Sequence, residues 1–389
     1  MDEDLVTPWE VKACNSHGIN YDKLIVKFGT STIDDALIKR FERLIGKPVH
    51  HLLRRGHFFT HRDFDLILTA YEEGKQIYLY TGRGPSSASL HIGHLIPFIF
   101  TKWLQDVFNA PLIIQFTDDE KYLWKNISLK EMESYVFENI KDVLAVGFNI
   151  NRVYVQINTM AMHQNPLFYP TVLSIQKHIT LNQVKAIFGI KESDSIGKCA
   201  FPAIEAAPCF SAMYKKIFRT NENVRCLIPC AIDQDPFFRM SRDVAPKLRF
   251  LKPSLLLSKF IPSLQGAMEK MSSSDNSTSI FLSDSPKDIK NKINKYAFSG
   301  GKDTVDEHRK FGGDCSVDVA YQYLTFFMEN DNKLNQIRKD YTDGTLLSGE
   351  MKNYAIAAIT AKLVEFQERR KLITSDHISL VTNYRDLSL

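Results

Sequence analysis

The sequence predicts an α/β protein with a doubly wound parallel sheet, followed by a helical domain at the C-terminal end. Three observations lead to this fold class. From residue 76 on, short apolar runs alternate with amphipathic segments, and a loop with two glycines follows the first run. After about residue 284 only helical periodicity remains. Strands that alternate with helices form parallel sheets of the Rossmann type, whose ligands bind at the carboxyl ends of the strands.

Five segments are predicted to be strands because they are short, apolar and rich in β-branched or aromatic residues. They are "IYLY" (77–80), "LIIQF" (112–116), "VYVQI" (153–157), "CLIPCAI" (226–232) and "LLLSKF" (255–260). A helix is predicted over residues 129–146, where Ser128 and Glu131 form a capping box and Gly147 can close the helix. Its apolar face consists of Met132, Val136, Ile140 and Val143.

The C-terminal region is predicted to be helical. "SPKDIKNKINKY" begins with Ser285 as N-cap, Pro286 at the first helical position and Asp288 as the second member of a capping box. Its lysines form either a solvated face or a contact to a phosphate backbone. Its apolar stripe consists of Ile289, Ile293 and Tyr296, and two further helices are predicted in "DVAYQYLTFFMEN" and "GEMKNYAIAAITAKLVEFQERRKLI".

These patterns divide the chain into three parts. An N-terminal extension (1–70) is expected to be irregular and to pack on the α/β domain (71–283), which precedes the helical domain (284–389). The last residues of the helical domain are free to return to the α/β domain. The extension carries four histidines, which fit no common zinc-ligand spacing and have no cysteine nearby, so they indicate a basic docking surface. They are His50, His51, His57 and His61.

Composition limits the possible compartments and partners. The chain is 44% apolar and 24% charged with a net charge of +4, which permits a nucleic-acid partner without arguing for one. Its six cysteines are too sparse for a disulfide scaffold, and Cys226 and Cys230 fit a buried strand better than a metal site. No signal peptide is expected at the acidic N-terminus, and the most apolar stretch is too interrupted to span a membrane. The sequence therefore predicts a cytoplasmic protein without a membrane segment or a bound metal.

The loop after the first strand reads "TGRGPSSASLHIGHL" and nearly matches a dinucleotide-binding fingerprint. Serine stands at position 87 where that fingerprint needs its third glycine, and no acidic residue follows at the required distance. No P-loop motif is present either. What remains is a loop in which Gly82 and Gly84 let a nucleotide approach the backbone. It leads into a helix that opens with His91, Gly93 and His94, whose imidazoles share one face and can donate hydrogen bonds to phosphate oxygens.

A second motif, "EKMSSSDNSTSIFL", follows the last predicted strand. Lys270 on this serine-rich segment can reach a polyphosphate, and Ser272 and Ser273 add small hydrogen-bond donors. In this order, at opposite ends of one predicted sheet, the two motifs resemble the HIGH and KMSKS signatures of class I aminoacyl-tRNA synthetases.

The resemblance extends over nearly the whole chain. It includes "IQFTDDEKYLWK", "IQKHITLNQVKAIFG", "FPAIEAAP", "CLIPCAIDQDPFFRM", "RDVAP", "AFSGGKDT", "FGGDC" and "YLTFF", and also "TPWEVK" and "YDKLIVKFG" near the N-terminus. These segments are similar to the eukaryotic type of tryptophanyl-tRNA synthetase. The extra N-terminal helix-hairpin domain of many animal members is expected to be absent.

The resemblance implies an enzyme that activates L-tryptophan with ATP and Mg²⁺ and transfers it to tRNA(Trp). It also implies a homodimer, a catalytic role for the α/β domain and an anticodon-binding role for the helical domain. His91, His94 and Lys270 are the implied catalytic residues. The implied ATP-binding set is Gly82, Gly84, His91, Gly93, His94, Lys270, Met271, Ser272 and Ser273. The implied tryptophan-binding set is Tyr80, Gln115, Glu120, Glu205, Gln234, Phe201, Ile228, Cys230 and Phe238.

Within that set, Tyr80 and Gln115 are expected to read the indole N–H, because this group only donates and a buried site must offer it an acceptor. Glu120, Glu205 and Gln234 are expected to face the ammonium group, and the remaining four side chains to line an apolar slot. The sequence departs from the family pattern at Glu205, where the family has glutamine. Ser273 stands where many synthetases carry a second lysine, which eukaryotic tryptophan enzymes commonly lack.

Other functions remain to be separated from this one. A tyrosine-specific synthetase shares the fold and both signatures. A small nucleotidyltransferase shares the histidine signature but fits neither the length nor the helical domain. A synthetase-derived binding or signalling protein without catalysis would have no need of His91, His94 and Lys270. An NAD-dependent oxidoreductase is excluded by Ser87 and the missing acidic partner.

Overall fold

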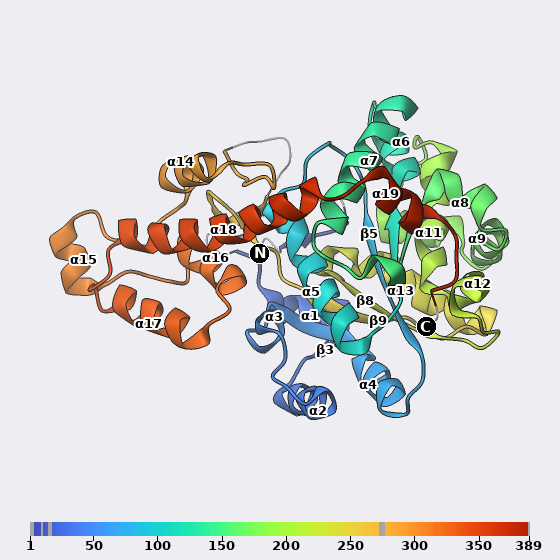
Figure 1. The fold of residues 1–389 in the computed structure, drawn as a ribbon, viewed down its shortest axis with the longest axis horizontal. Helices are drawn as coiled ribbons and strands as arrows, with labels where there is room; N and C mark the ends of the chain where they lie inside the picture. Colours follow the sequence, from blue (N-terminus) through green and yellow to red (C-terminus); the bar gives the residue numbers. More distant parts are fainter. Residues whose placement is uncertain (1–3, 9–10, 15–17, 272–276, 388–389) are drawn as a thin grey trace.

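The computed structural model describes residues 4–8, 11–14, 18–271 and 277–387, with backbone only at 267–270. An α/β body carries a helical domain that extends from one of its sides, with α15 at the far end (Figure 1). The chain ends back on the α/β body, so the molecule is elongated and its long helix α18 (Ser348–Lys371) runs from the helical domain toward that body. No described helix is long and apolar enough to cross a membrane.

The main sheet has the strand order β3-β4-β9-β8-β5-β6-β7. The five predicted strands are confirmed and form its parallel part: β5 (Ile77–Arg83), β6 (Leu112–Phe116), β7 (Val153–Ile157), β8 (Arg225–Ala231) and β9 (Ser254–Ser258). The sheet is mixed rather than wholly parallel, because β4 (Phe58–Arg62) pairs antiparallel with β9 and β3 (Ser31–Thr32) pairs antiparallel with β4.

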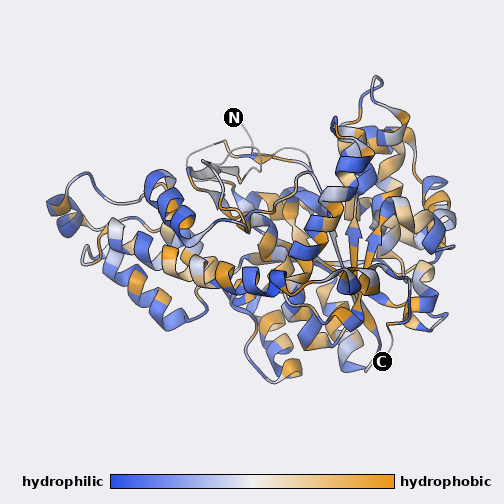
Figure 2. Ribbon diagram, turned by 45° about the horizontal axis from the view of Figure 1, so that its top comes forward, coloured by the Kyte–Doolittle hydropathy of each residue, from blue (hydrophilic) through white to orange (hydrophobic). Residues whose placement is uncertain are grey.

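Alternate side chains of the strands enter two different cores. In β5, Leu79 packs into a core with α5 (Ile92–Phe108) and α7 (Leu129–Leu144), while Tyr78 and Tyr80 pack on the opposite face. This alternation follows from the two-residue period of a strand. The strands are mostly coloured as hydrophobic in Figure 2 because both faces are covered.

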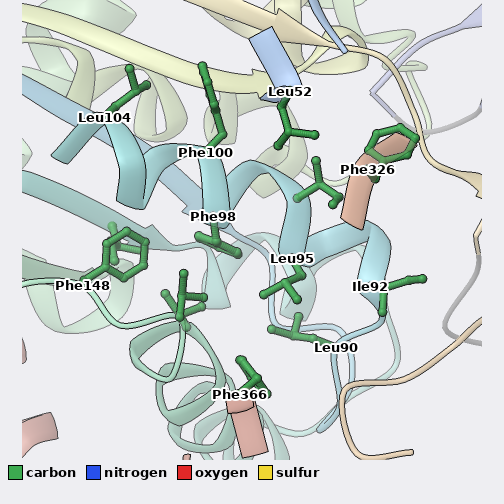
Figure 3. Packing of buried hydrophobic residues seen from close by; sticks show 14 of the residues in the cluster. Leu52, Leu90, Ile92, Leu95, Phe98, Phe100, Leu104, Phe148, Phe326 and Phe366 are labelled. Atoms are coloured by element: carbon green, nitrogen blue, oxygen red, sulfur yellow. The ribbon is translucent and has the colours of Figure 1, made fainter. Parts of the chain in front are cut away.

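The apolar side of α5 anchors the helix that carries the two histidines. Leu95, Phe98 and Leu104 point into the first core together with Leu52 and Phe366 from distant parts of the chain (Figure 3). Phe58 and Phe100 stack with ring centroids 3.8 Å apart. Because these side chains are buried from several sides, the start of α5 is held firmly near the carboxyl end of β5.

The second face of the sheet is covered by helices from the middle of the chain. They are α6 (Asp118–Trp124), α8 (Asn158–Gln164), α9 (Phe168–Gln176), α10 (Leu181–Phe188), α11 (Ile196–Ala206), α12 (Lys215–Phe218) and α13 (Asp235–Val244). The same part of the chain contains short 3₁₀ turns at Ile150–Arg152, Ala207–Cys209, Ser211–Tyr214, Ile232–Gln234 and Ala245–Leu248. Their buried residues include Phe188, Phe201 and Phe237, which pack against one another.

The predicted caps are confirmed where the structure forms helices. Ser128 and Glu131 make the capping box of α7, which ends two residues earlier than predicted. Ser285 and Asp288 make the box of α14 (Pro286–Tyr296), and Ile289 and Ile293 are buried as expected. The other helices of this region are α15 (Val305–Phe311), α16 (Val319–Phe327), α17 (Asp331–Thr342), α18 and α19 (Ser375–Thr382). α19 packs on β7, and the Tyr384 hydroxyl donates to the Met213 carbonyl oxygen.

The expectation of an irregular N-terminal extension is wrong. It forms α1 (Tyr21–Phe28), α2 (Asp35–Ile45), α3 (His51–Arg54), β3 and β4, and α4 (Phe64–Glu72) follows. Asn20 and Asp34 cap the first two helices, and each helix ends at a glycine in the left-handed conformation. Short helices with good caps give little periodicity, and β4 is a strand because it pairs with β9 far along the chain.

The four histidines of the extension do not form a basic surface. Burial lowers the pKa of His50 and of His57 to about 3, and His51 and His61 are also buried. Neutral rings at His51 and His57 instead bond to carbonyl oxygens of α16, at 2.8 and 3.2 Å. The prediction of a basic docking surface is therefore wrong: two of these histidines bond as neutral rings to α16 of the same chain.

A second, small sheet joins the N-terminus to the segment of the second motif. Its order is β1 (Leu5–Val6), β2 (Val11–Lys12), β11 (Gly266–Lys270) and β10 (Pro262–Ser263). The Asp4 carboxylate accepts hydrogen bonds from the backbone N–H groups of Cys14 and Asn20 and ties this hairpin to the start of α1. Strands from the N-terminal extension thus pair with strands near the end of the α/β domain, although about 250 residues of sequence separate them.

Candidate active site

A cavity of about 370 Å³ opens where β5, β8 and β9 end, beside the N-terminus of α5. Carboxyl ends of parallel strands are the usual place for a ligand in this fold. Thirteen of the expected site residues line it: Gly82, Gly84, His91, Gly93, His94, Glu120, Phe201, Glu205, Ile228, Cys230, Gln234, Phe238 and Met271.

Tyr80 and Gln115 are brought together, but behind the cavity lining rather than on it. Both are fully buried. The Tyr80 hydroxyl donates to Gln115 Oε1 at 2.5 Å and lies 3.2 Å from the Glu205 carbonyl oxygen. The Tyr80 ring meets Phe238 edge to face, with centroids 5.9 Å apart. The pair therefore offers a buried amide oxygen immediately behind α11.

One end of the cavity is apolar. Phe201 is 1% exposed and Ile228 is fully buried, and Cys230 and Phe238 complete this slot. Burial raises the pKa of the Cys230 thiol well above its usual range, so the side chain is a neutral thiol that behaves as an apolar group. Such a slot accepts a flat aromatic or aliphatic group of a ligand.

The other end carries carboxyl groups. The Glu120 carboxylate is held by two neighbouring groups: Thr117 donates to its Oε2 at 2.9 Å, and Lys121 Nζ forms an ion pair with its Oε1 at 2.6 Å. Gln234, at the end of a 3₁₀ turn, lines the same region. The Glu205 carboxyl accepts no hydrogen bond from the described residues.

The electrostatics of Glu205 differ from those of Glu120. Burial, together with the charges of Glu120 and Asp119, raises the pKa of Glu205 to about 8, against a smaller opposing effect of Lys121. Glu205 is therefore protonated at neutral pH in the empty cavity. A cationic group placed here favours its ionised form, because an opposite charge stabilises a carboxylate.

The two histidines stand at the N-terminus of α5. His91 is its N-cap, and its backbone N–H donates a long hydrogen bond to His94 Nδ1 at 3.4 Å. The rings stack with centroids 3.6 Å apart. A neutral His94 whose Nδ1 accepts carries its proton on Nε2, where it can donate to an anion. The dipole of α5 favours an anion at the same helix start.

The glycines of the loop differ in what requires them. A Cβ at Gly84 would lie 2.2 Å from Lys121 Cε, so a side chain there would displace the flexible end of Lys121, which forms the ion pair with Glu120. A Cβ at Gly82 would meet only the Gln115 carbonyl oxygen at 3.6 Å, an ordinary contact. A Cβ at Gly93 would lie 3.0 Å from the His91 ring and from Ile261, so a side chain there would displace the first histidine.

The second motif is described only in part. The backbone of Lys270 ends β11, where it pairs with Pro262, and Met271 is buried and lines the cavity. Ser272 and Ser273 lie outside the described residues. Pro8, between β1 and β2, lines the cavity too, so the N-terminal hairpin forms part of its wall.

Several lining residues were not expected from the sequence. Arg83 lies in the quoted glycine loop; its Nε donates to Asn139 at 3.0 Å, and its buried Nη2 bonds to no described residue. Thr117 and Lys121 flank the expected Glu120, so their nearness to the site was a usable signal. Lys259 and Pro8 reach the cavity through contacts between distant segments, which no local pattern reveals.

Comparison with known proteins gives consistent matches. The model of the tRNA synthetases class I (W and Y) matches residues 72–364. The chain is 57% identical to the human cytoplasmic tryptophan–tRNA ligase over 387 residues, covering 100% of this chain and 82% of the human protein. It resembles the crystal structure of Plasmodium falciparum tryptophanyl-tRNA synthetase, with a TM-score of 0.89, 48% identity and coverage of 94% and 98% of the two chains. The crystal structure of the Encephalitozoon cuniculi tryptophanyl-tRNA synthetase bound to tryptophan is also similar, with a TM-score of 0.88 and 42% identity. The match covers 95% of this chain and 99% of that one.

Proposed function

The chain belongs to the class I tRNA synthetases for tryptophan and tyrosine, and on this premise we propose that it is a tryptophan–tRNA ligase. It activates L-tryptophan with ATP to tryptophanyl-adenylate and pyrophosphate, and then transfers the tryptophanyl group to tRNA(Trp). Its curated relatives carry the word cytoplasmic in their names, and we assign the protein to the same compartment.

The observation that carries the choice of tryptophan is a buried amide acceptor behind an apolar slot. The indole N–H only donates, and Gln115 Oε1 can accept from it with the lone pair that the Tyr80 hydroxyl leaves unused. A site built on such a bond rejects analogues that lack the N–H far better than apolar shape does. Because Tyr80 and Gln115 lie behind the lining, binding includes a small rearrangement of that lining.

The polar end suits the amino-acid ammonium group. Glu120 presents a carboxylate, Gln234 an amide oxygen, and Glu205 a second carboxyl that ionises when a cation arrives. The carboxylate of the substrate then points toward the α5 end of the cavity, where His91 and His94 stand.

The reaction needs positioning more than a protein nucleophile. The tryptophan carboxylate attacks the α-phosphate of ATP, and pyrophosphate leaves. His91, His94 and the bare backbone of Gly82, Gly84 and Gly93 hold the ATP, while Lys270, Met271, Ser272 and Ser273 of the second motif approach the leaving pyrophosphate. Charge that develops on the phosphoryl group is stabilised by these donors.

Mg²⁺ enters with ATP. Within the described ranges no group of three or more His, Cys, Asp or Glu side chains could hold a metal ion, so the protein offers no cage of its own there. The phosphates of ATP then supply most of the metal's ligands, as is common for Mg²⁺. When bound, Mg²⁺ neutralises part of the phosphate charge.

Dimerisation and anticodon binding complete the proposal. Large apolar side chains are exposed on helices α6 and α8–α11, which pack against one another. They are Tyr122, Met162, Leu167, Tyr169, Leu173, Leu181 and Ile196. A surface of this kind fits a contact between two copies of the chain. The helical domain, residues 284–389 apart from the returning C-terminus, is the part that contacts the anticodon of tRNA.

One assay tests the activity. We expect ATP–pyrophosphate exchange that depends on tryptophan and is at least about a hundredfold weaker with tyrosine, because a pocket built around one polar contact discriminates strongly. The Lys270→Ala variant, purified identically, should exchange far more slowly while tryptophan binding stays near normal, which excludes a contaminating host enzyme. Exchange that prefers tyrosine would make the protein a tyrosine enzyme. Exchange with neither amino acid would indicate a synthetase-derived binding protein.

A further inference from the structure

A chain of buried hydrogen bonds leads away from the indole end of the cavity. Gln115 Nε2 donates to Asn158 Oδ1 at 2.9 Å, and Asn158 Nδ2 donates to Asp119 Oδ1 at 2.8 Å. Gln115 and Asn158 are 0% and 1% exposed. Neither Asn158 nor Asp119 lines the cavity or belongs to the expected site set.

Both ends of this chain determine the orientation of its amide groups. At one end, the Ile204 carbonyl oxygen lies 3.3 Å from Gln115 Nε2 and can only accept, so the nitrogen of Gln115 must face it. At the other end, Asp119 Oδ1 also accepts from the Glu120 backbone N–H at 2.9 Å, so this oxygen calls for a donor from Asn158 as well. The positions of nitrogen and oxygen therefore follow from the bonding pattern and leave Gln115 Oε1 facing Tyr80.

The backbone determines the position of Asn158 beside Gln115. β6 and β7 are neighbouring parallel strands, and α6 and α8 begin where they end. Asp118 accepts from the backbone N–H and the hydroxyl of Thr159, at 3.2 and 2.5 Å, which joins the first turns of the two helices. Asn158 is thereby fixed at the first residue of α8, beside Gln115 in the next strand.

We propose that Asn158, held by Asp119, is a positioning residue for substrate specificity that keeps the oxygen of the Gln115 amide facing the indole N–H. The inference rests on the proposed function, since it assigns the chemistry of tryptophan recognition to a residue that does not touch tryptophan. A flipped Gln115 would present an N–H group to the N–H of indole and its oxygen to Asn158 Oδ1. Asn158 Oδ1 makes that flip unfavourable, and so does the Ile204 carbonyl oxygen.

The consequence is a specific change in discrimination. Without Asn158, the amide is oriented only by the longer bond to the Ile204 carbonyl oxygen and by the Tyr80 hydroxyl, which can accept as well as donate. Part of the Gln115 population then turns its nitrogen toward the ligand, and tryptophan loses its acceptor. An analogue with sulfur in place of the indole N–H has no such bond to lose. The kcat/KM for this analogue stays constant or rises, while the kcat/KM for tryptophan falls.

The test compares kcat/KM for tryptophan with kcat/KM for β-(3-benzothienyl)alanine in ATP–pyrophosphate exchange. We expect the ratio to fall about tenfold in Asn158→Ala, the size expected for one buried hydrogen-bond network weakened at a recognition site. Asn158→Leu fills the same space without polar atoms and serves the same purpose should the alanine variant fail to fold. Asn158→Asp, which can share one proton with Asp119 and still accept from Gln115, should recover most of the ratio.

The matched control is Asn165→Ala at the other end of α8. Asn165 is also fully buried and donates to the Met213 carbonyl oxygen at 3.1 Å, but it makes no contact with Gln115. It should leave the ratio unchanged even where it lowers stability. An unchanged ratio in a folded Asn158 variant, or an equal fall in the control, would overturn the inference. A wild-type enzyme without tryptophan-dependent exchange would overturn the proposed function, and the inference with it.

Discussion

Two glutamates at the polar end of the cavity show how neighbours decide the charge of a residue. Glu120 is ion-paired with Lys121 and accepts from Thr117. Glu205 is buried without such partners, and burial together with Glu120 and Asp119 raises its pKa to about 8. A single lysine cannot compensate several buried carboxylates, so the one without a close cation keeps its proton. The side chain is thus a neutral acid until an ammonium group reaches it.

This state of Glu205 predicts proton release on tryptophan binding. Below pH 8 the free protein holds the proton and the complex favours the ionised carboxylate, so binding releases up to about one proton and apparent affinity rises with pH toward 8. The measurement is titration calorimetry at pH 7 in two buffers with different ionisation enthalpies. Glu205→Gln, which cannot titrate, is the control; it should bind with an affinity that is flatter in pH.

Burial also raises the pKa of Asp119 to about 7, so only the difference between wild type and Glu205→Gln isolates Glu205. Equal proton release by the two proteins would show that Glu205 keeps its protonation state. Proton release and apparent affinity are both measured between pH 6 and 8.5.

At the scale of single residues, the sequence could predict those that belong to a local motif. His91, Gly93 and His94 stand at a helix start after a strand, and chemistry alone suggested a phosphate contact. Asn158 and Asp119 could not be found in this way, because their role arises only when β6 and β7 lie side by side. The state of Glu205 likewise depends on carboxyl groups that meet it only in the folded chain.

Secondary-structure elements far apart in the sequence are joined through the end of α3. Arg55 donates from Nη1 to the carbonyl oxygens of Thr325 and Met328, at 2.8 and 2.7 Å, and its Nη2 lies 2.5 Å from Asp331 Oδ1. The last carbonyl groups of α16 have no partner within their helix, and a cation is favourable at this end. Arg55 therefore caps α16 and fastens the helical domain to the N-terminal extension.

The contact predicts a large effect for one side chain. Arg55→Ala should lower the free energy of unfolding by about 1–3 kcal/mol, because it removes the donor to the Met328 carbonyl oxygen and one of the two arginines that bind the Asp331 carboxylate. Lys75→Ala is the matched control: its ion pair with Glu73 is exposed, with side-chain exposures of 69% and 49%. Its loss should cost less than about 0.5 kcal/mol. Urea unfolding followed by circular dichroism measures both, and similar values for the two variants would contradict the capping role.

The elements themselves were predictable to very different degrees. The five parallel strands and α7 and α14 have strong local patterns, so their positions were right within a few residues. α1 and α2 carry clear caps at Asn20 and Asp34, but they are short, and Phe41 of α2 finds its partners only on α4 and α5, far along the chain. The short strands of the second sheet could not be predicted, because β2 lies in the N-terminal extension and its partner β11 lies near the end of the α/β domain.

Over the whole molecule, exposed large apolar side chains recur on α6 and α8–α11 of the α/β body, whereas most apolar side chains of its sheet lie in the two buried cores. Ile196 is 85% exposed and Leu181 57%, on helices that pack against α11 or belong to it. α11 also carries Phe201 and Glu205 into the cavity. A second copy of the chain on these helices would therefore lie behind one wall of the cavity.

The surface predicts an oligomeric state that two substitutions can change. Burying this patch against a second copy removes apolar area from water, whereas charges there would have to be desolvated without partners. Wild-type protein should sediment as a dimer, and the double variant Leu173→Asp, Ile196→Asp as a monomer. Leu372→Asp is the matched control, since Leu372 is 71% exposed but lies at the end of α18, away from α9 and α11. Analytical ultracentrifugation distinguishes the cases: a monomeric wild type, or a variant that stays dimeric, would assign this surface to something other than self-association. Because α11 connects the surface to the cavity, the monomeric variant should also bind tryptophan more weakly than the control.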